Sequence, residues 1–142
     1  MITGNQKQEY LDMFNAVLGL NLDLADLKML TDIDAHGKPL AVVGFFNSSQ
    51  YNLEMSIASV TGWTGTRFFA KACFDYAFNR CGAMRITCYA RESNVKSIYF
   101  QTRLGFKREF SGVLKHWFGK EDGVQFFMLK KNCKWLKETK KC

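Results

Sequence analysis

The sequence predicts an α+β fold with α/β/α layers, in which helices cover both faces of a mixed, mostly antiparallel sheet of about six to seven strands. An amphipathic helical stretch opens the chain, and stretches with strand-like patterns follow it. Strands alternate with helices only in the middle of the chain, which favours a mixed sheet. At 142 residues the chain is long enough for one core, so we assign residues 1–142 to a single domain.

The N-terminal elements follow from the spacing of apolar residues. A helix is expected over residues 5–19, with its apolar face made by Tyr10, Phe14, Val17 and Leu18. Residues 21–27 alternate in polarity but are rich in Asn and Asp, so we expect a short helix or loop there. Strands over 28–35 and 39–46 form a predicted hairpin, because Gly37 between them tolerates a positive φ.

The stretch from Leu53 to Phe78 is the centre of the predicted fold. Residues 52–59 are expected to form a strand, 60–65 a tight turn and 66–81 a helix that is apolar nearly all round and therefore buried. A strand that leads through small residues into a helix brings first-turn N–H groups and the positive end of the helix dipole together. Such a turn is typical of phosphate-binding sites, although two glycines also occur in turns without a ligand.

The remaining predicted elements are, in order, a strand over 84–90, a helix capped by Ser93 or Asn94 and ended by Gly105, and a pair of strands over 106–118 and 124–129.

Charge is unevenly distributed along the chain. Residues 1–66 hold three Lys against seven acidic residues, net −4, whereas residues 67–142 hold 17 basic against six acidic residues, net +11. A basic half favours nucleic acid, a membrane surface or a polyanionic nucleotide cofactor as partner. Much of the positive charge lies in residues 130–142, which we interpret as a solvated basic tail.

Several classes of protein are disfavoured. No apolar run is long enough to span a bilayer and the N-terminus has no signal-peptide pattern, so we expect a cytoplasmic protein without membrane partners. The five cysteines lack paired spacing and only two histidines are present, so we expect reduced, mostly buried thiols and no metal site. No nucleic-acid-binding motif accompanies the basic charge.

Three segments carry a family resemblance. The strand, loop and helix from Glu54 to Phe78 correspond to a cofactor-binding motif, and 94–106 combines a capping Asn, a Ser one turn later and a terminal Gly-Phe. The Tyr-Ala-Phe at 76–78 and Cys-Gly at 81–82 precede the strand that begins near Arg85. These segments resemble the GNAT acyl-coenzyme A N-acyltransferases, and within that superfamily the ribosomal-protein N-terminal acetyltransferase branch and short bacterial and phage-encoded members.

The resemblance implies a site for acetyl-coenzyme A as co-substrate. The pantetheine arm would lie along the backbone of Ile57, Ala58, Ser59 and Val60. The pyrophosphate would be held by the loop residues Gly62, Trp63, Gly65, Thr66 and Arg67. Asn94 and Ser97 would lie beside the distal pantetheine and the thiol. The loop is a few residues short and fits the family pattern only with the loss of either one glycine or the leading Arg or Gln, a charge that Arg67 would replace. Gln101 occupies the position of the tyrosine that is frequent in the family.

Glu54 is the candidate catalytic base. It is the only acidic residue between Asp34 and Asp75, and it resembles in position the carboxylate base of histone-acetylating members. Its alternative role is structural, as a strand carboxylate bonded to a neighbour. Cys88 lacks a nearby His in sequence and is interpreted as core, and Trp63 either covers the loop or packs beneath it.

The predicted function is direct transfer of an acetyl group from acetyl-coenzyme A to a primary amine on a protein N-terminus, a lysine or a small molecule. The acidic N-terminal half suits a cationic acceptor, His116 is either a gate for it or a surface residue, and a homodimer is left open. The alternatives are a catalytically impaired GNAT-fold interaction or structural protein and, less favoured, a nucleic-acid-binding module.

Overall fold

The computed structural model describes residues 1–136. In this part of the chain, eight strands form one sheet in the order β1-β2-β3-β4-β5-β8-β6, and β7 pairs with β8. The elements are β1 Ile2–Thr3, α1 Gln8–Leu18, β2 Leu27–Ile33, β3 Pro39–Phe46, β4 Asn52–Ser59, α2 Arg67–Asp75, β5 Arg85–Arg91, α3 Val95–Leu104, β6 Lys107–Arg108, β7 Leu114–Phe118 and β8 Glu121–Leu129. Single helical turns cover Leu24–Asp26, Tyr76–Arg80 and Lys130–Asn132.

The predicted fold class is confirmed. Every strand pair is antiparallel except β4 with β5. Eight strands are found rather than six to seven, because the short β1 pairs with β2 and the closing segment makes three strands rather than two. The expected strand over 52–59 is found with those bounds, and the ambiguous 21–27 contains a short 3₁₀ turn.

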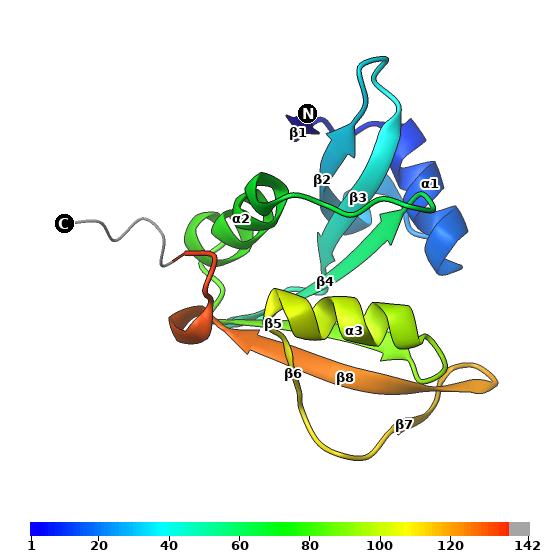
Figure 1. Cartoon of the computed structure of the whole chain (residues 1–142), viewed down its shortest axis with the longest axis vertical. Helices are drawn as coiled ribbons and strands as arrows, with labels where there is room; N and C mark the ends of the chain where they lie inside the picture. Colours follow the sequence, from blue (N-terminus) through cyan, green and yellow to red (C-terminus); the bar gives the residue numbers. More distant parts are fainter. Residues whose placement is uncertain (137–142) are drawn as a thin grey trace.

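Helices cover both faces of the sheet, and each face has its own core. Figure 1 shows α1 beside β2, β3 and β4, and α3 lying along β5 and β8. The α1 core consists of Tyr10, Leu11, Phe14, Leu27, Met29, Val42 and Ala58. The larger core on the opposite face contains residues of α2, β5 and β8, with Ile98 and Leu104 of α3 packed against it. The alternation of β4 thus places Met55 and Ala58 in different cores, as the sequence predicts.

The helix predicted over 66–81 consists of α2 and a π-helical turn that continues it. Its buried side carries Phe69, Cys73 and Phe74, but the prediction that Phe68 is also buried is wrong, since that side chain is 81% exposed. The reason is helical period, because Phe68 lies two turns before Asp75 and shares its solvent side. The helix is therefore buried on one side only.

The two halves of the sheet separate between β4 and β5. These strands pair only from Asn52 with Arg85 to Glu54 with Thr87, whereas β5 continues in register with β8 as far as Arg91. The rest of β4 has β3 as its partner on the other side. Beyond Glu54, one edge of β4 therefore faces a gap between diverging strands, which opens the sheet at its centre.

The closing hairpin differs from its prediction. The strand expected over 106–118 is broken into β6 and β7, and β8 begins at Glu121 rather than at 124. Between β6 and β7 the chain forms a turn, in which the Arg108 side chain donates hydrogen bonds to the carbonyls of Phe110 and Gly112. Gly119, at φ 78°, allows a turn between β7 and β8 that is shorter than expected.

The segment after β8 is not a solvated tail at its start. Cys133 is buried, and the Trp135 ring stacks on Phe74 at a centroid distance of 6.4 Å. The Trp135 Nε1 group also donates a 2.8 Å hydrogen bond to the carbonyl of Leu104 at the end of α3. Residues 137–142 of the predicted basic tail lie outside the described residues.

A glycine of β3 sets the distance between α1 and the sheet, and this predicts a measurable loss of stability. A Cβ atom at Gly44 would lie 2.6 Å from Phe14 Cζ and 2.9 Å from Leu27 Cδ1. We expect Gly44→Ala to lower the free energy of unfolding by about 1–3 kcal/mol, because overpacking a core exceeds the gain of about 0.4–1 kcal/mol from a less flexible unfolded chain.

Urea unfolding measures this difference, with Gly4→Ala as the matched control. A Cβ at Gly4 has its nearest contact at 3.9 Å, so the control keeps only the favourable effect on the unfolded chain. Equal stabilities for the two variants would contradict the close approach of α1 to β3.

Candidate functional site

The loop between β4 and α2 has the conformation that its two glycines predict. Gly62 and Gly65 have φ values of 87° and 77°, in the left-handed region that favours glycine. Thr66 then caps α2, since its hydroxyl oxygen accepts a 3.0 Å hydrogen bond from the backbone N–H of Phe69. The loop thereby brings the positive end of the α2 dipole to a cavity that Met55 and Ile57 of β4 also line.

A cavity of about 510 Å³ lies at this end of α2. Its wall is formed by Met55 and Ile57 of β4, the loop from Trp63 to Thr66, the first turns of α2, the exposed side of α3, and Trp135. Three basic side chains line it, those of Arg67, Lys96 and Arg103. A concave site with a helix N-terminus and three cations suits a polyanionic ligand with an apolar portion.

The α3 side of this cavity was missed by the sequence analysis. Lys96, Tyr99 and Arg103 lie three and four residues apart, which places them along one side of the helix. The Arg103 guanidinium lies over the Tyr99 ring at 5.6 Å and donates a 3.3 Å hydrogen bond to its hydroxyl. Their helical spacing was visible in the sequence, and only the proximity of α3 to α2 was not.

The free edge of β4 directs backbone groups toward the separation from β5, and of the residues at that edge Met55 and Ile57 line the cavity. Val60 donates its N–H to the carbonyl of Leu40 in the preceding strand, at 2.9 Å. Because hydrogen-bonding groups alternate along a strand, Ile57 and Ser59 direct theirs toward the separation. Of the four residues predicted to offer backbone here, Ile57 and Ser59 face the gap, whereas Ala58 and Val60 face β3.

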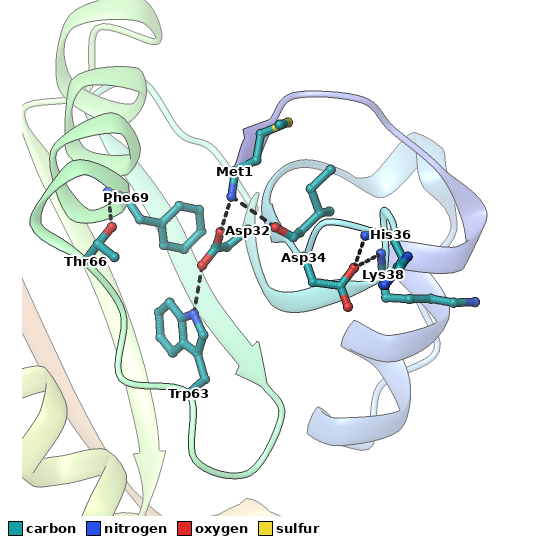
Figure 2. Close-up of polar contacts among 9 residues, drawn as sticks. Met1, Asp32, Asp34, His36, Lys38, Trp63, Thr66 and Phe69 are labelled. Carbon is teal, nitrogen blue, oxygen red and sulfur yellow. Dashed lines mark hydrogen bonds and ion pairs between the residues drawn. The ribbon is translucent and has the colours of Figure 1, made fainter.

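Trp63 both packs and lines the cavity. Its indole meets the rings of Phe69 and Phe100 nearly edge-on, at centroid distances of 5.8 and 6.2 Å, so it bridges α2 and α3. Figure 2 shows its Nε1 group pointing to Asp32 of β2, to which it donates a 3.0 Å hydrogen bond. The other Asp32 oxygen accepts from the α-amino group of Met1 at 3.1 Å. The loop is therefore tethered to β2, which lies two strands away from β4 in the same half of the sheet.

The start of α3 is arranged around Asn94. Its side-chain oxygen accepts a 3.1 Å hydrogen bond from the backbone N–H of Ser97, so of the two predicted caps Asn94 is the one used. The Ser97 hydroxyl accepts from Gln101, whose carbonyl oxygen accepts from the Cys88 thiol at 2.8 Å. Neither Asn94 nor Ser97 belongs to the cavity wall given above. Gln101 is buried between α3 and β5.

Cys88 is part of the core, as predicted. Its side chain is buried, and burial raises the pKa of the thiol well above its ordinary value, so the reactive thiolate is disfavoured. Of the other described cysteines, Cys73 and Cys133 are also buried and Cys81 is exposed, all as free thiols.

Glu54 lies on the other side of the sheet from the cavity, beside the last paired residues of β4 and β5. Its register partner is Thr87, and its carboxylate accepts a 3.1 Å hydrogen bond from the Asn47 side chain. Burial raises the pKa of the half-buried Glu54 carboxyl, and the Asn47 hydrogen bond acts in the opposite direction. A carboxylate with a raised pKa next to an opening is typical of a general base.

Within residues 1–136, no group of three or more His, Cys, Asp or Glu side chains has an arrangement that holds a metal ion. The same residues contain no helix that is long and apolar enough to cross a bilayer.

The overall arrangement of the sheet and its helices is shared with solved structures of GNAT acetyltransferases, so the resemblance read from the sequence is confirmed at the level of the fold. The chain is similar to spermidine N-acetyltransferase from Vibrio cholerae in complex with CoA and spermine, with a TM-score of 0.73 and 14% identity over 96% of this chain and 97% of that one.

Another similar structure is ribosomal-protein-S5-alanine acetyltransferase from Vibrio fischeri, with a TM-score of 0.63 and 19% identity over 78% of this chain and 64% of that one. No protein-family model matches the sequence, and no curated protein matches it.

The cap of α2 can be tested separately from any ligand. We expect Thr66→Ala to lower the free energy of unfolding by about 0.5–2 kcal/mol, because the Phe69 N–H loses its acceptor. Thr64→Ala is the control, since Thr64 lines the same cavity but does not cap the helix. Denaturant midpoints of the two variants measure the difference, and a midpoint for Thr66→Ala equal to that of the wild type would exclude the cap.

Proposed function

We propose that this protein is an acetyl-coenzyme A-dependent N-acetyltransferase that transfers the acetyl group directly to a primary amine. One observation carries the proposal. The sheet opens between β4 and β5 with a basic cavity on one side and the Glu54 carboxylate on the other. Two reactants can thus approach one opening from opposite faces, which is what direct transfer between them requires.

The residues of the cavity suit coenzyme A. The amides of the loop from Gly62 to Arg67 and the α2 N-terminus would hold the pyrophosphate, and Lys96 and Arg103 would add positive charge from α3. The backbone of Ile57 and Ser59 would bond the amide groups of the pantetheine arm. Ala58 and Val60 would contribute by keeping β4 paired to β3. Asn94 and Ser97 would act through α3, by fixing its first turn.

The bound cofactor supplies an acetyl thioester, and the chain supplies proton transfer. An amine attacks only as the neutral base, so its ammonium form must first lose a proton. Glu54 would accept that proton, directly or through one water molecule. Its raised pKa makes it a stronger base than an exposed glutamate. Gln101 is engaged with Ser97 and Cys88, so the proton donor to the departing thiolate is not at the position that the family resemblance indicates.

Cofactor binding is the first test. Acetyl-coenzyme A at 100 times its Kd should stabilise the protein by about 2.7 kcal/mol, which raises Tm by several degrees. The double variant Lys96→Ala, Arg103→Ala should give a smaller shift, because two of the three cations in the cavity wall are removed. Lys115→Ala with Lys120→Ala is the control of equal charge change on the β7–β8 hairpin. An unchanged Tm of the wild type at millimolar acetyl-coenzyme A would contradict the proposal.

The second test addresses Glu54. We expect Glu54→Gln to lower turnover about 10²- to 10⁴-fold while the acetyl-coenzyme A shift in Tm remains. The best acceptor among butylamine, a lysine-containing peptide and spermidine is used, with release of free coenzyme A thiol as the readout. The exposed Glu92→Gln is the control.

The pH dependence of kcat/KM tests whether Glu54 acts in its ionised form. The base works when ionised, so wild-type kcat/KM should fall as pH decreases through the raised pKa of Glu54, above the ordinary glutamate range. Glu54→Gln should lack that decrease. Turnover and pH profile equal to those of the wild type would remove Glu54 from the mechanism.

A further inference from the structure

The half of the sheet made by β5 and β8 has one open face. Its α3 side buries Ile86, Cys88, Val124 and Phe126. On the opposite side α1 packs against β3 and β4, and the α1 core contains no residue of β5 or β8. The residues of β5 and β8 that face this way are half-buried except for Thr87, which is buried, and we refer to them as the open face: Arg85, Thr87, Tyr89, Gln125 and Phe127.

An aromatic pair lies on the open face. The rings of Tyr89 and Trp117 have centroids 4.7 Å apart and planes 33° apart, and Trp117 remains 50% exposed. A Cβ at Gly123 would lie 3.0 Å from Trp117 Cβ, so only glycine lets the indole lie on β8 at this point. The pair is thus held against the sheet while part of its surface contacts solvent.

The backbone of β7 is distorted next to this pair. His116 has φ 55°, a left-handed value that is costly for a residue with a side chain. Asp122 holds it there by accepting a 2.9 Å hydrogen bond from the His116 N–H, and the β7–β8 register shifts between Leu114 and Phe118. The hydrogen bonds of the hairpin hold His116 in this strained conformation. The strained residue directly precedes Trp117.

The carboxylates around the open face differ in what neutralises them. Glu109 pairs with Arg85, Glu121 with Arg91, and Asp122 with Lys115. Glu54 accepts its hydrogen bond from a neutral amide, and no basic side chain among the described residues pairs with it. Glu54 is the register partner of Thr87, so its side chain lies on the open face too. Tyr89 is the next residue of β5 on that face. Burial and then the Glu54 charge raise the pKa of the Tyr89 phenol, so Tyr89 stays neutral.

We propose that Tyr89, Trp117 and Glu54 form the acceptor subsite, and that they recognise a primary amine through one positive charge on an apolar stem, so that the further charges of a polyamine add nothing to its affinity. The inference rests on the proposed function, and it specifies the acceptor of that same site. Aromatic faces attract an ammonium group and pack against its alkyl stem. Glu54 then provides one carboxylate for one charge. The further charges of a polyamine would meet carboxylates that Arg and Lys already neutralise.

The three tryptophans allow one experiment to test both proposals. In the chain labelled with ¹⁵N-tryptophan, the indole resonances of Trp63, Trp117 and Trp135 are assigned with single Trp→Phe variants. Coenzyme A should shift Trp63 and Trp135, which line the cavity. Butylammonium, added to the coenzyme A complex, should shift Trp117 in a saturable manner, and 1-butanol at the same concentrations should not.

Two comparisons decide the charge preference. Spermidine should bind with a Kd within threefold of that of butylammonium, since its additional charges gain no partner. Glu54→Gln should weaken butylammonium at least tenfold, whereas Glu92→Gln should leave its Kd unchanged.

A Trp117 resonance that does not respond to butylammonium, or spermidine bound at least tenfold more tightly, would overturn the acceptor subsite. Either result can occur while Trp63 and Trp135 still respond to coenzyme A. Loss of that response would instead count against the proposed function.

Discussion

The early end of hydrogen bonding between β4 and β5 is the constraint on which the rest of the structure depends. The two strands pair over three residues each and then diverge, and each keeps a partner on its other side. The sheet therefore remains continuous while its centre opens. Continued pairing with β5 would have satisfied the backbone groups of Ile57 and Ser59. Because the pairing ends at Glu54, these groups are available to bind a ligand.

Everything that the proposed reaction needs is placed relative to that opening. The left-handed glycines of the loop turn the chain so that α2 begins at the gap, and Trp63 links the loop to both helices and to β2. The charged side chains are divided between the two faces of the sheet. Arg67, Lys96 and Arg103 lie on the α2 and α3 side, whereas Glu54 lies on the other. The sheet thus separates a basic cavity from the Glu54 carboxylate, which is the arrangement that the proposed reaction of an anionic cofactor with a cationic acceptor requires.

Features that depend on the spacing of residues within one element could be predicted from the sequence. Features that depend on how distant segments pack together could not. The bounds of β4, a cap at Ser93 or Asn94 and the Gly105 stop follow from patterns within one element. The α3 and Trp135 contributions to the cavity depend on how α2 and α3 pack, and no local pattern reports it. Phe68 is exposed because its helical position, rather than its apolar character, decides its burial, and the break after β6 coincides with a turn in which Arg108 bonds to the carbonyls of Phe110 and Gly112.

The wall formed by Trp135 has a consequence for the order in which the protein is made. The cavity contains a loop tethered to Asp32 of β2, and it is closed by a tryptophan about a hundred positions later in the chain that stacks on Phe74 and bonds to Leu104. During synthesis the loop between β4 and α2 exists long before the far wall of the cavity does. A nascent chain that has emerged only through β8 lacks that wall, so the proposed cofactor site should be completed only when Trp135 has emerged and docks.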